Sequence, residues 1–246
     1  MIELAGIAKS FPGHASLLRG VDLTIQRGER WGLIGPGASG KSVLAKILVR
    51  LLAPDAGKIV VDGTDVTRTP EAGLGAWRAR FGMLFQNYAL FDFMTVAENV
   101  AFPLRRRGGI AASEIDARVA ERLRAVGLAG SEDKHPSQLS GGMKRRLGIA
   151  RATIAQPELV IYDEPTAGLD PVTTSKIYDL LLADHAATGA TVIAISSDVA
   201  ALRGFCPRVG MLYGGVLHYD GPSAGMQDAA DPVVRQFVRG ELEGPL

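Results

Sequence analysis

An octapeptide near the N-terminus has the residue types and spacing of a phosphate-binding loop, G-x-x-x-x-G-K-S. It consists of Gly35, Pro36, Gly37, Ala38, Ser39, Gly40, Lys41 and Ser42. Glycines let backbone N–H groups approach phosphate oxygens, and a following helix adds the positive end of its dipole. Lys41 would neutralise the β- and γ-phosphates of a nucleotide, and Ser42 would hold Mg²⁺. The octapeptide therefore predicts a nucleoside triphosphate site.

The residues around this phosphate loop predict the order strand, loop, helix that the motif requires. Residues 31–34 are typical of a short buried strand, and residues 43–52 place apolar side chains at helical spacing. Val43 is the first residue of that helical pattern, and we predict that it also contacts the nucleotide. The alternative is an ordinary glycine turn before a helix.

Two carboxylates follow a second apolar run. Asp163 and Glu164 come directly after residues 159–162, which read Leu-Val-Ile-Tyr. A buried parallel strand would deliver both side chains at its carboxyl end, where ligands bind in open α/β sheets. Asp163 would hold Mg²⁺ through the water shell of the ion, and Glu164 would polarise the attacking water as general base. By itself, an apolar strand followed by Asp and Glu is usually an ordinary strand end. The phosphate loop upstream favours the catalytic interpretation.

A second phosphate cradle is formed by Ser140, Gly141 and Gly142, which precede an apolar helix expected at residues 147–155. We expect that this Ser-Gly-Gly cradle does not reach the phosphate loop of the same chain. A head-to-tail homodimer resolves this, because the cradle of one chain would then cover the nucleotide that the other holds. The alternative is a plain helix cap with a basic first turn.

Length, charge and cysteine content narrow the class of protein. The chain of 246 residues is long enough for one large α/β domain with an inserted subdomain. A net charge of +1 gives no electrostatic footprint for nucleic acid, and the single cysteine, Cys206, allows no internal disulfide. No apolar run approaches the ~18 residues that span a bilayer, and the N-terminus does not read as a secretion signal. We therefore expect a cytoplasmic protein that reaches a membrane only through a partner.

The pattern along the chain predicts three parts. Residues 1–92 and 156–230 would form a nucleotide-binding α/β core, which begins with short antiparallel strands in residues 1–34 and has strands again at 58–62, 81–85, 159–162, 191–195 and 209–212. Residues 93–155 would form a helical subdomain, in which Ser113 caps a helix that Gly127 ends. Residues 231–246 would form a tail with a short helix, because Asp231 and Pro232 suit the N-cap and first position.

With these three motifs in this order, the sequence resembles the ATP-binding subunit of an ABC transporter over almost the whole chain. The resemblance implies an α/β fold with a P-loop NTPase (RecA-like) core, an N-terminal antiparallel β-subdomain and an inserted helical subdomain. It also implies ATP and Mg²⁺ as cofactors, a homodimer, integral membrane permease subunits and a place on the cytoplasmic face of the membrane. It assigns Gln86 to sensing nucleotide and Mg²⁺ beside the permease, Asp170 to communication between the two sites, and Phe11 to stacking on adenine.

Several strings are similar to the Mla/Mce group of this family, whose complexes move phospholipid or other lipids between membranes. They are residues 40–44, 85–91, 94–100, 231–237 and the string Ser-Gly-Gly-Met at 140–143. The similarity implies a lipid cargo and a lipid-binding Mce-type subunit that is reached through the permease.

Two positions depart from the family pattern. Ser197 stands where the family has a histidine that contacts the γ-phosphate. Serine can donate a hydrogen bond but has no titratable imidazole ring, so we expect slow hydrolysis. Ala38 stands where most relatives have glycine. If that position requires a positive φ, alanine is strained by about 1 kcal/mol or more and nucleotide affinity drops modestly.

Some patterns leave alternatives open. The apolar residues at positions 88–94 either dock a partner or pack between subdomains, and the arginines at 105–107 lie in a solvated loop or contact lipid headgroups or an acidic partner. The tail helix packs on its own domain or on a partner. Three alternatives also stay open: a soluble ABC ATPase of repair or translation, a regulatory subunit that hydrolyses little or no ATP, and an importer or exporter of a non-lipid cargo.

Overall fold

The computed structural model describes residues 1–13 and 16–246, so His14 lies outside the described residues. The chain forms two compact units, one of Met1–Arg78 with Thr191–Leu246 and one of Ala79–Ala190. The second unit is longer than the helical subdomain expected at 93–155, because it also contains two strands. Each unit is described by itself below.

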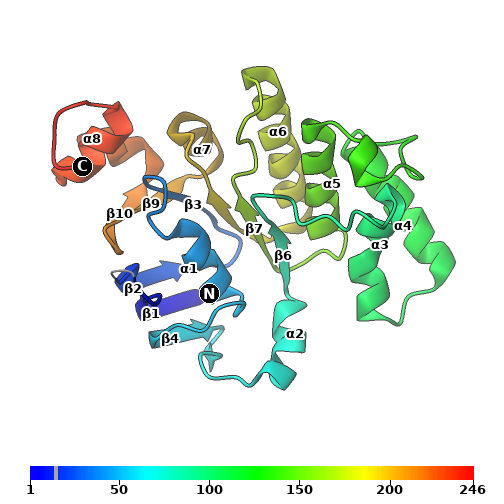
Figure 1. The fold of residues 1–246 in the computed structure, drawn as a ribbon, viewed down its shortest axis with the longest axis horizontal. Coiled ribbons are helices and arrows are strands. Elements are labelled where there is room, and N and C mark those ends of the chain that lie inside the picture. Colours follow the sequence, from blue (N-terminus) through cyan, green and yellow to red (C-terminus); the bar gives the residue numbers. More distant parts are fainter. Residues whose placement is uncertain (14–15) are drawn as a thin grey trace. The chain divides into compact units, whose positions relative to one another are not determined.

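The first unit contains an antiparallel sheet in the order β2-β1-β4-β5 (Figure 1). Its strands are β1 (Ile2–Lys9), β2 (Leu18–Ile25), β4 (Ala56–Val61) and β5 (Thr64–Asp65). Apolar side chains on one face, such as Ile2, Leu4 and Ile7, are buried, as expected of a sheet with one solvated face. The antiparallel subdomain predicted from residues 1–34 is therefore present, and β4 and β5 complete it.

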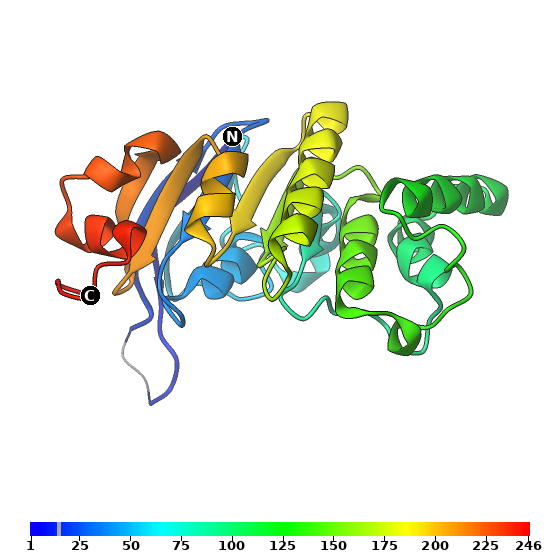
Figure 2. The ribbon, with the colours of Figure 1, turned by 90° about the horizontal axis from the view of Figure 1, so that it is seen from above.

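The same unit contains a parallel arrangement that positions the phosphate loop (Figure 2). Strand β3 (Arg30–Ile34) lies between β8 (Thr191–Ile195) and β9 (Arg208–Tyr213) and is parallel to both, and β10 (Val216–Pro222) pairs with β9 antiparallel. The phosphate loop follows β3 and Ser197 follows β8, so both leave the same edge of this sheet. The helices of the unit are α1 (Lys41–Leu48), α2 (Leu74–Arg78), α7 (Val199–Phe205) and α8 (Pro232–Arg239), with 3₁₀ turns at Glu71–Gly73 and Ser223–Asp228.

The second unit joins a pair of strands to four helices. Strands β6 (Phe81–Leu84) and β7 (Leu159–Asp163) are parallel. The helices are α3 (Val96–Arg107), α4 (Ala112–Ala125), α5 (Gly141–Thr153) and α6 (Pro171–Thr188), with a 3₁₀ turn at Pro136–Gln138. Helix α5 packs directly on β6, since a Cβ on Gly82 would lie 2.0 Å from the carbonyl oxygen of Ala152. Helices α3, α4 and α5 enclose an apolar core that includes Val100, Leu123 and Leu147.

Three sequence predictions about helix limits are corrected. Ser113 does not cap its helix: α4 starts at Ala112, because the carbonyl of Ala111 accepts the N–H groups of Glu114 and Ile115. The helix expected at 147–155 starts six residues earlier, at Gly141. Helix α1 ends at Leu48 and not at residue 52. Gly127 does follow the end of α4, with a φ of 67° that suits glycine there.

The tail helix α8 forms as predicted. The Asp231 carboxylate accepts the N–H of Val233 at 2.8 Å, and Pro232 is the first helical residue. Val233 and Val234 are buried against the 3₁₀ turn at Ser223–Asp228 and β10 of the same unit. Of the two alternatives for this helix, packing on its own domain is therefore observed.

Candidate nucleotide-binding site

The phosphate loop is shaped by glycines at its two ends. Gly35 has a φ of 146°, and a Cβ there would lie 2.1 Å from the carbonyl oxygen of Leu212. Gly40 has a φ of 101° and is the N-cap of α1, whose first N–H groups receive no side-chain cap. The loop therefore ends in a helix N-terminus with uncapped backbone donors, the geometry that binds phosphate.

The Lys41 side chain folds back over the phosphate loop that precedes it. The Lys41 ammonium donates to the carbonyl oxygens of Gly35 and Pro36 at 2.9 and 2.8 Å, and the residue is 9% exposed. An ammonium held beside a helix N-terminus adds positive charge at the place where the helix itself favours an anion. Lys41 and the uncapped N–H groups of α1 thus suit a polyphosphate.

Ala38 has a φ of 59°, so the position does require a left-handed backbone. The strain expected for alanine here is therefore present, at about 1–2 kcal/mol for a residue with a Cβ. Glu164 in the second unit, with a φ of 53°, also has a left-handed backbone conformation. Such conformations concentrate at functional sites, where the surroundings maintain them.

The carboxylates follow β7 as the sequence predicts. Asp163 ends the strand and is 3% exposed, and Glu164 comes next in a partly exposed position. Leu84 of β6 is in register with Tyr162 of β7, so Gln86 and Glu164 each lie two residues beyond a paired position. The structure thus brings Gln86 and the two carboxylates to one edge of this strand pair.

Each unit offers an oxygen donor of the kind that Mg²⁺ prefers. The Ser42 hydroxyl in the first unit and the Asp163 carboxylate in the second are both hard oxygen ligands. Residues 1–13 and 16–246 contain no cluster of three or more His, Cys, Asp or Glu side chains that could hold a metal. Protein sites for Mg²⁺ commonly supply one or two oxygens and leave the rest to phosphate and water, which these residues fit.

The Ser-Gly-Gly cradle forms the first turn of α5. The Ser140 hydroxyl accepts the N–H of Met143 at 3.3 Å and caps the helix. A Cβ added to Gly141 would meet nothing within 4 Å, and one added to Gly142 would only touch Leu169 at 4.0 Å. Packing within the chain therefore does not require either glycine, which leaves an exposed helix N-terminus that an external anion can approach closely.

Asp170 and Phe11 also make contacts within the chain. Asp170 caps α6, since its carboxylate accepts the N–H and the hydroxyl of Thr173 at 2.9 and 2.6 Å, and these hydrogen bonds hold its pKa below the ordinary value. The Phe11 ring is partly exposed, and the Lys9 ammonium lies 5.7 Å from its centroid. Both residues keep exposed atoms, so both stay predictions as nucleotide ligands.

Ser197 is exposed just beyond β8. The residues on either side of Ser197 form hydrogen bonds with groups nearby in the sequence. The Ser196 hydroxyl accepts the N–H of Asp198 at 3.0 Å, and Asp198 caps α7 by accepting the N–H of Ala201. Of the histidines, His185 bonds the carbonyl of Ala190 and His218 pairs with Asp231. These contacts hold the His185 imidazole at the end of α6 and the His218 imidazole at the start of α8.

Comparison with known proteins decides the family. Residues 18–167, more than half of the chain, match the family model described as ABC transporter. The chain belongs to the ABC transporter family. Comparison with solved structures confirms its fold: the dimeric, post-hydrolysis structure of the ATP-binding cassette MJ0796 bound to ADP and Pi superposes with a TM-score of 0.85 at 30% identity, and covers 91% of this chain and 99% of that one.

Curated relatives of this ABC transporter subunit carry two kinds of name. It is 41% identical to the "Probable ribonucleotide transport ATP-binding protein mkl" of Mycobacterium tuberculosis (strain H37Rv), over 100% of this chain and 68% of that protein. It is 42% identical to the "Methionine import ATP-binding protein MetN" of Caulobacter vibrioides, over 99% of this chain and 74% of that protein. No helix in the described part of the chain is long and apolar enough to cross a membrane.

The apolar cluster after Gln86 in this ABC transporter subunit is only partly exposed. Phe93 is 76% exposed, whereas Tyr88, Leu90, Phe91 and Met94 are partly buried. The Phe91 ring packs between Phe93 and Phe102, with centroids 5.8 and 4.8 Å away. The expectation that some of these residues would be exposed therefore holds for Phe93, and the others pack within their own unit.

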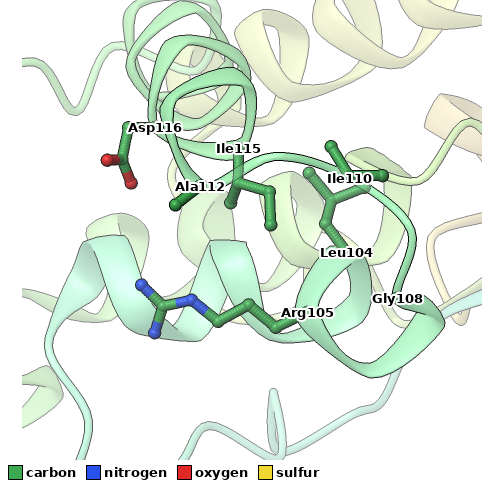
Figure 3. Close-up of a pocket in the computed structure, with 7 residues that line it drawn as sticks. All are labelled: Leu104, Arg105, Gly108, Ile110, Ala112, Ile115 and Asp116. Carbon is green, nitrogen blue, oxygen red and sulfur yellow. The ribbon is translucent and has the colours of Figure 1, made fainter.

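The three arginines at 105–107 lie in the last turn of α3, not in a loop, and all are exposed. Arg105 lines a small cavity between α3 and α4, whose apolar walls are Leu104, Ile110 and Ile115 (Figure 3). Asp116 faces Arg105 at the rim. The cavity includes none of the predicted nucleotide ligands.

Sequence reasoning missed the residues that hold the segment after Gln86. They are Arg145 and Arg151 on α5 and Asn99 on α3, all buried. Their partners lie 4 to 63 positions away along the chain. The one available signal in the sequence was a polar residue at a helical position where an apolar side chain is expected. This signal does not identify the residue's hydrogen-bond partner.

Proposed function

We propose that this chain is the ATP-binding and ATP-hydrolysing subunit of an ABC transporter, which dimerises on ATP and drives a membrane permease from its cytoplasmic face. The observation that carries the proposal is the phosphate loop, where the buried Lys41 ammonium lies at the uncapped N-terminus of α1. Family membership supports it independently.

In this proposal the loop amides from Gly35 to Val43 and the Lys41 ammonium bind the phosphates of ATP. Ser42, Asp163 and Gln86 hold Mg²⁺, which neutralises phosphate charge when bound. Glu164 accepts a proton from the attacking water, and its left-handed backbone supports a functional constraint at that position. Phe11 stacks on adenine.

The Ser-Gly-Gly cradle would complete the site of a second copy. Its two glycines have open space where a Cβ would be, which supports close approach by a phosphate from outside the chain. The similar cassette MJ0796 has been solved as a dimer bound to ADP and Pi, which also supports this arrangement. Asp170 lies at the start of α6, next in sequence to Leu169, which approaches Gly142.

The decisive experiment traps the dimer. With ATP and Mg²⁺, Glu164→Gln should bind ATP normally, lose phosphate release and shift from monomer to dimer in analytical ultracentrifugation. Glu132→Gln, at a carboxylate away from every motif, is the matched control and should hydrolyse like the unaltered chain. A Glu164→Gln protein that still releases phosphate would remove Glu164 as the base, and failure of the unaltered chain to bind ATP would reject the proposal.

For the cargo, we propose a lipid, on the similarity to the Mla/Mce group of the strings at 40–44, 85–91, 94–100, 140–143 and 231–237. The relatives named for ribonucleotide transport and for methionine import favour these cargoes as the alternative. Purification of the chain with its membrane partners would separate the three. A co-purifying permease with a lipid-binding Mce-type subunit and bound phospholipid supports the lipid, whereas ATPase stimulation by methionine or a ribonucleotide rejects it.

A regulatory subunit with little hydrolysis is the second candidate, and Ser197 is the residue that favours it. The presence of both Asp163 and Glu164 at the end of β7 favours hydrolysis. Phosphate release by the complex with its permease, lost in Glu164→Gln, distinguishes the two.

A further inference from the structure

The loop between β1 and β2 carries Phe11 and is closed beside the phosphate loop. The carbonyl oxygen of Lys9 accepts the N–H of Leu17 at 2.8 Å, so the two ends of this loop meet. A Cβ added to Gly40, the N-cap of α1, would lie 3.3 Å from Cγ of Leu17 and 3.0 Å from Cδ2 of Leu18. The Phe11 ring is thus carried by a loop whose base adjoins the start of α1.

Asp55, which directly precedes β4, is bonded to the residues in front of Phe11. Its Oδ1 accepts the Lys9 ammonium and its Oδ2 accepts the N–H of Ser10, both at 2.7 Å. Its own N–H donates to the carbonyl oxygen of Ala8 at 2.9 Å. The hydrogen bond from Lys9, followed by that from Ser10, holds the pKa of Asp55 below the ordinary value, so the carboxylate is ionised at neutral pH. One residue, 46 positions after Lys9, therefore contacts three consecutive residues before Phe11.

The Lys9 ammonium contacts both the Asp55 carboxylate and the Phe11 ring. It lies 5.7 Å from the ring centroid, within the range of a cation–π interaction. The Lys9 side chain is 16% exposed and that of Asp55 is 46% exposed, so the lysine is packed while the carboxylate stays in contact with solvent. A cation over one face of an aromatic ring leaves the opposite face available for stacking with a nucleobase.

Stability of the antiparallel sheet does not account for this arrangement. Strands β1 and β4 are already joined by backbone pairing, whose last pair is Ala8 with Ala56. An exposed ion pair adds little to the free energy of unfolding. The contacts of Asp55 instead extend the attachment beyond that last pair, to Lys9 and Ser10. They restrict the chain at the two residues that precede Phe11.

We propose that Asp55 and Lys9 are positioning residues for the nucleobase of a bound nucleotide. Asp55 holds Lys9, and the Lys9 ammonium covers one face of the Phe11 ring. The other face is then presented to the aromatic base of a nucleotide whose phosphates bind at the start of α1. The inference rests on the proposed function, since it needs a nucleotide at the phosphate loop. It assigns a binding role to two residues that lie outside the phosphate loop, the Ser-Gly-Gly cradle and the carboxylate motif.

Binding of ADP and of pyrophosphate to the full chain tests this inference. Both ligands carry phosphates for the loop, but only ADP carries a base, and titration calorimetry with Mg²⁺ measures both affinities. Phe11→Ala should lower the affinity for ADP about 5- to 150-fold, the effect of losing the stacking of one base on an aromatic ring. Asp55→Ala should lower it several-fold, and less than Phe11→Ala does. The affinity for pyrophosphate should stay unchanged in both variants.

A double-mutant cycle shows whether Asp55 acts through Phe11. If it does, Asp55→Ala should cause no further loss of ADP affinity in a chain that already carries Phe11→Ala. Lys9→Ala should behave like Asp55→Ala, because it removes the group between the carboxylate and the ring. Lys9→Arg keeps a cation that can pair with the carboxylate and lie over the ring, so it should retain most of the ADP affinity.

Asp65→Ala is the matched control. Asp65 is an exposed carboxylate in β5 of the same sheet that accepts the N–H of Thr67 at 2.8 Å, and its removal should leave ADP affinity unchanged.

Three results overturn the inference: unchanged ADP affinity in Phe11→Ala or Asp55→Ala, an equal loss of pyrophosphate affinity in Asp55→Ala, or independent losses from the two substitutions in the cycle. If Asp55→Ala does not fold, Lys9→Ala decides by the same criteria. If the unaltered chain binds neither ATP nor ADP, the proposed function is rejected instead.

Discussion

The Nζ atom of Lys41 lies 2.9 Å from the carbonyl oxygen of Gly35, so the lysine is held inside the loop that it serves. We expect Lys41→Met to weaken ATP affinity roughly 10- to 100-fold, because a hydrogen bond to a charged group contributes about 1.5–3 kcal/mol. Titration calorimetry would measure this. Lys46→Met removes the same charge from the last turn of α1 and should change affinity little; equal losses in both variants would mean that only net charge matters.

Ala38→Gly should stabilise the protein. The left-handed conformation costs alanine about 1–2 kcal/mol, while glycine adds about 0.4–1 kcal/mol of unfolded-state entropy, so the net gain is up to about 1.5 kcal/mol. Urea unfolding would detect it, and a modest gain in ATP affinity should accompany it. Ala45→Gly, inside α1, should instead lose about 1 kcal/mol. If Ala38→Gly loses stability as Ala45→Gly does, the backbone at position 38 is not strained.

Gly141→Ala separates folding from hydrolysis. A Cβ at this position meets nothing in its own chain, so the unfolding free energy should stay equal or rise by up to about 1 kcal/mol. Hydrolysis and ATP-dependent dimerisation should nevertheless fall at least ten-fold, roughly one lost charged hydrogen bond, because the methyl group would obstruct an approaching phosphate.

Gly204→Ala in α7 is the control, because its Cβ also has open space, and it should leave hydrolysis unchanged. Unimpaired hydrolysis in Gly141→Ala would contradict the shared site.

Ser197→His should raise the ATPase rate of the complex with its permease several-fold, since an imidazole reaches farther than a hydroxyl and can orient the attacking water. ATP affinity should change less than the rate. Phosphate release under saturating ATP measures the effect, with Ser113→His at an exposed helical position as the control. No change in rate would remove Ser197 as the reason for slow hydrolysis.

Cys206 should resist alkylation in the folded protein. It is fully buried, and burial raises the pKa of its thiol to about 12. Because the folded pKa lies above the unfolded value of about 8.5, the neutral thiol contributes stability that is complete below pH ~8.5 and is lost as pH rises toward 12.

Mass spectrometry after iodoacetamide treatment should find Cys206 unmodified near pH 8 and fully modified after unfolding in guanidinium chloride. Rapid modification of the native chain would show that the thiol is accessible.

The amino-acid sequence by itself determined the features that depend on neighbouring residues. The phosphate loop needs glycines where φ is positive, and Asp163 and Glu164 follow an apolar strand, so both motifs could be located from spacing. The caps at Ser140 and Asp231 are equally local, since a cap bonds an N–H two or three residues away. The fold class follows from the order of these local elements.

Only the tertiary structure decided what depends on residues far apart in the chain. Ala38 shows its positive φ only in the folded loop, and Ser113 lost its predicted role because the carbonyl of Ala111 begins the helix. Among many arginines, Arg145 and Arg151 are buried against Tyr88 while those at 105–107 are exposed, and no local spacing separates the two groups. Burial is set by packing between distant segments, so the attachment of Tyr88 to α5 could be found only in the folded chain.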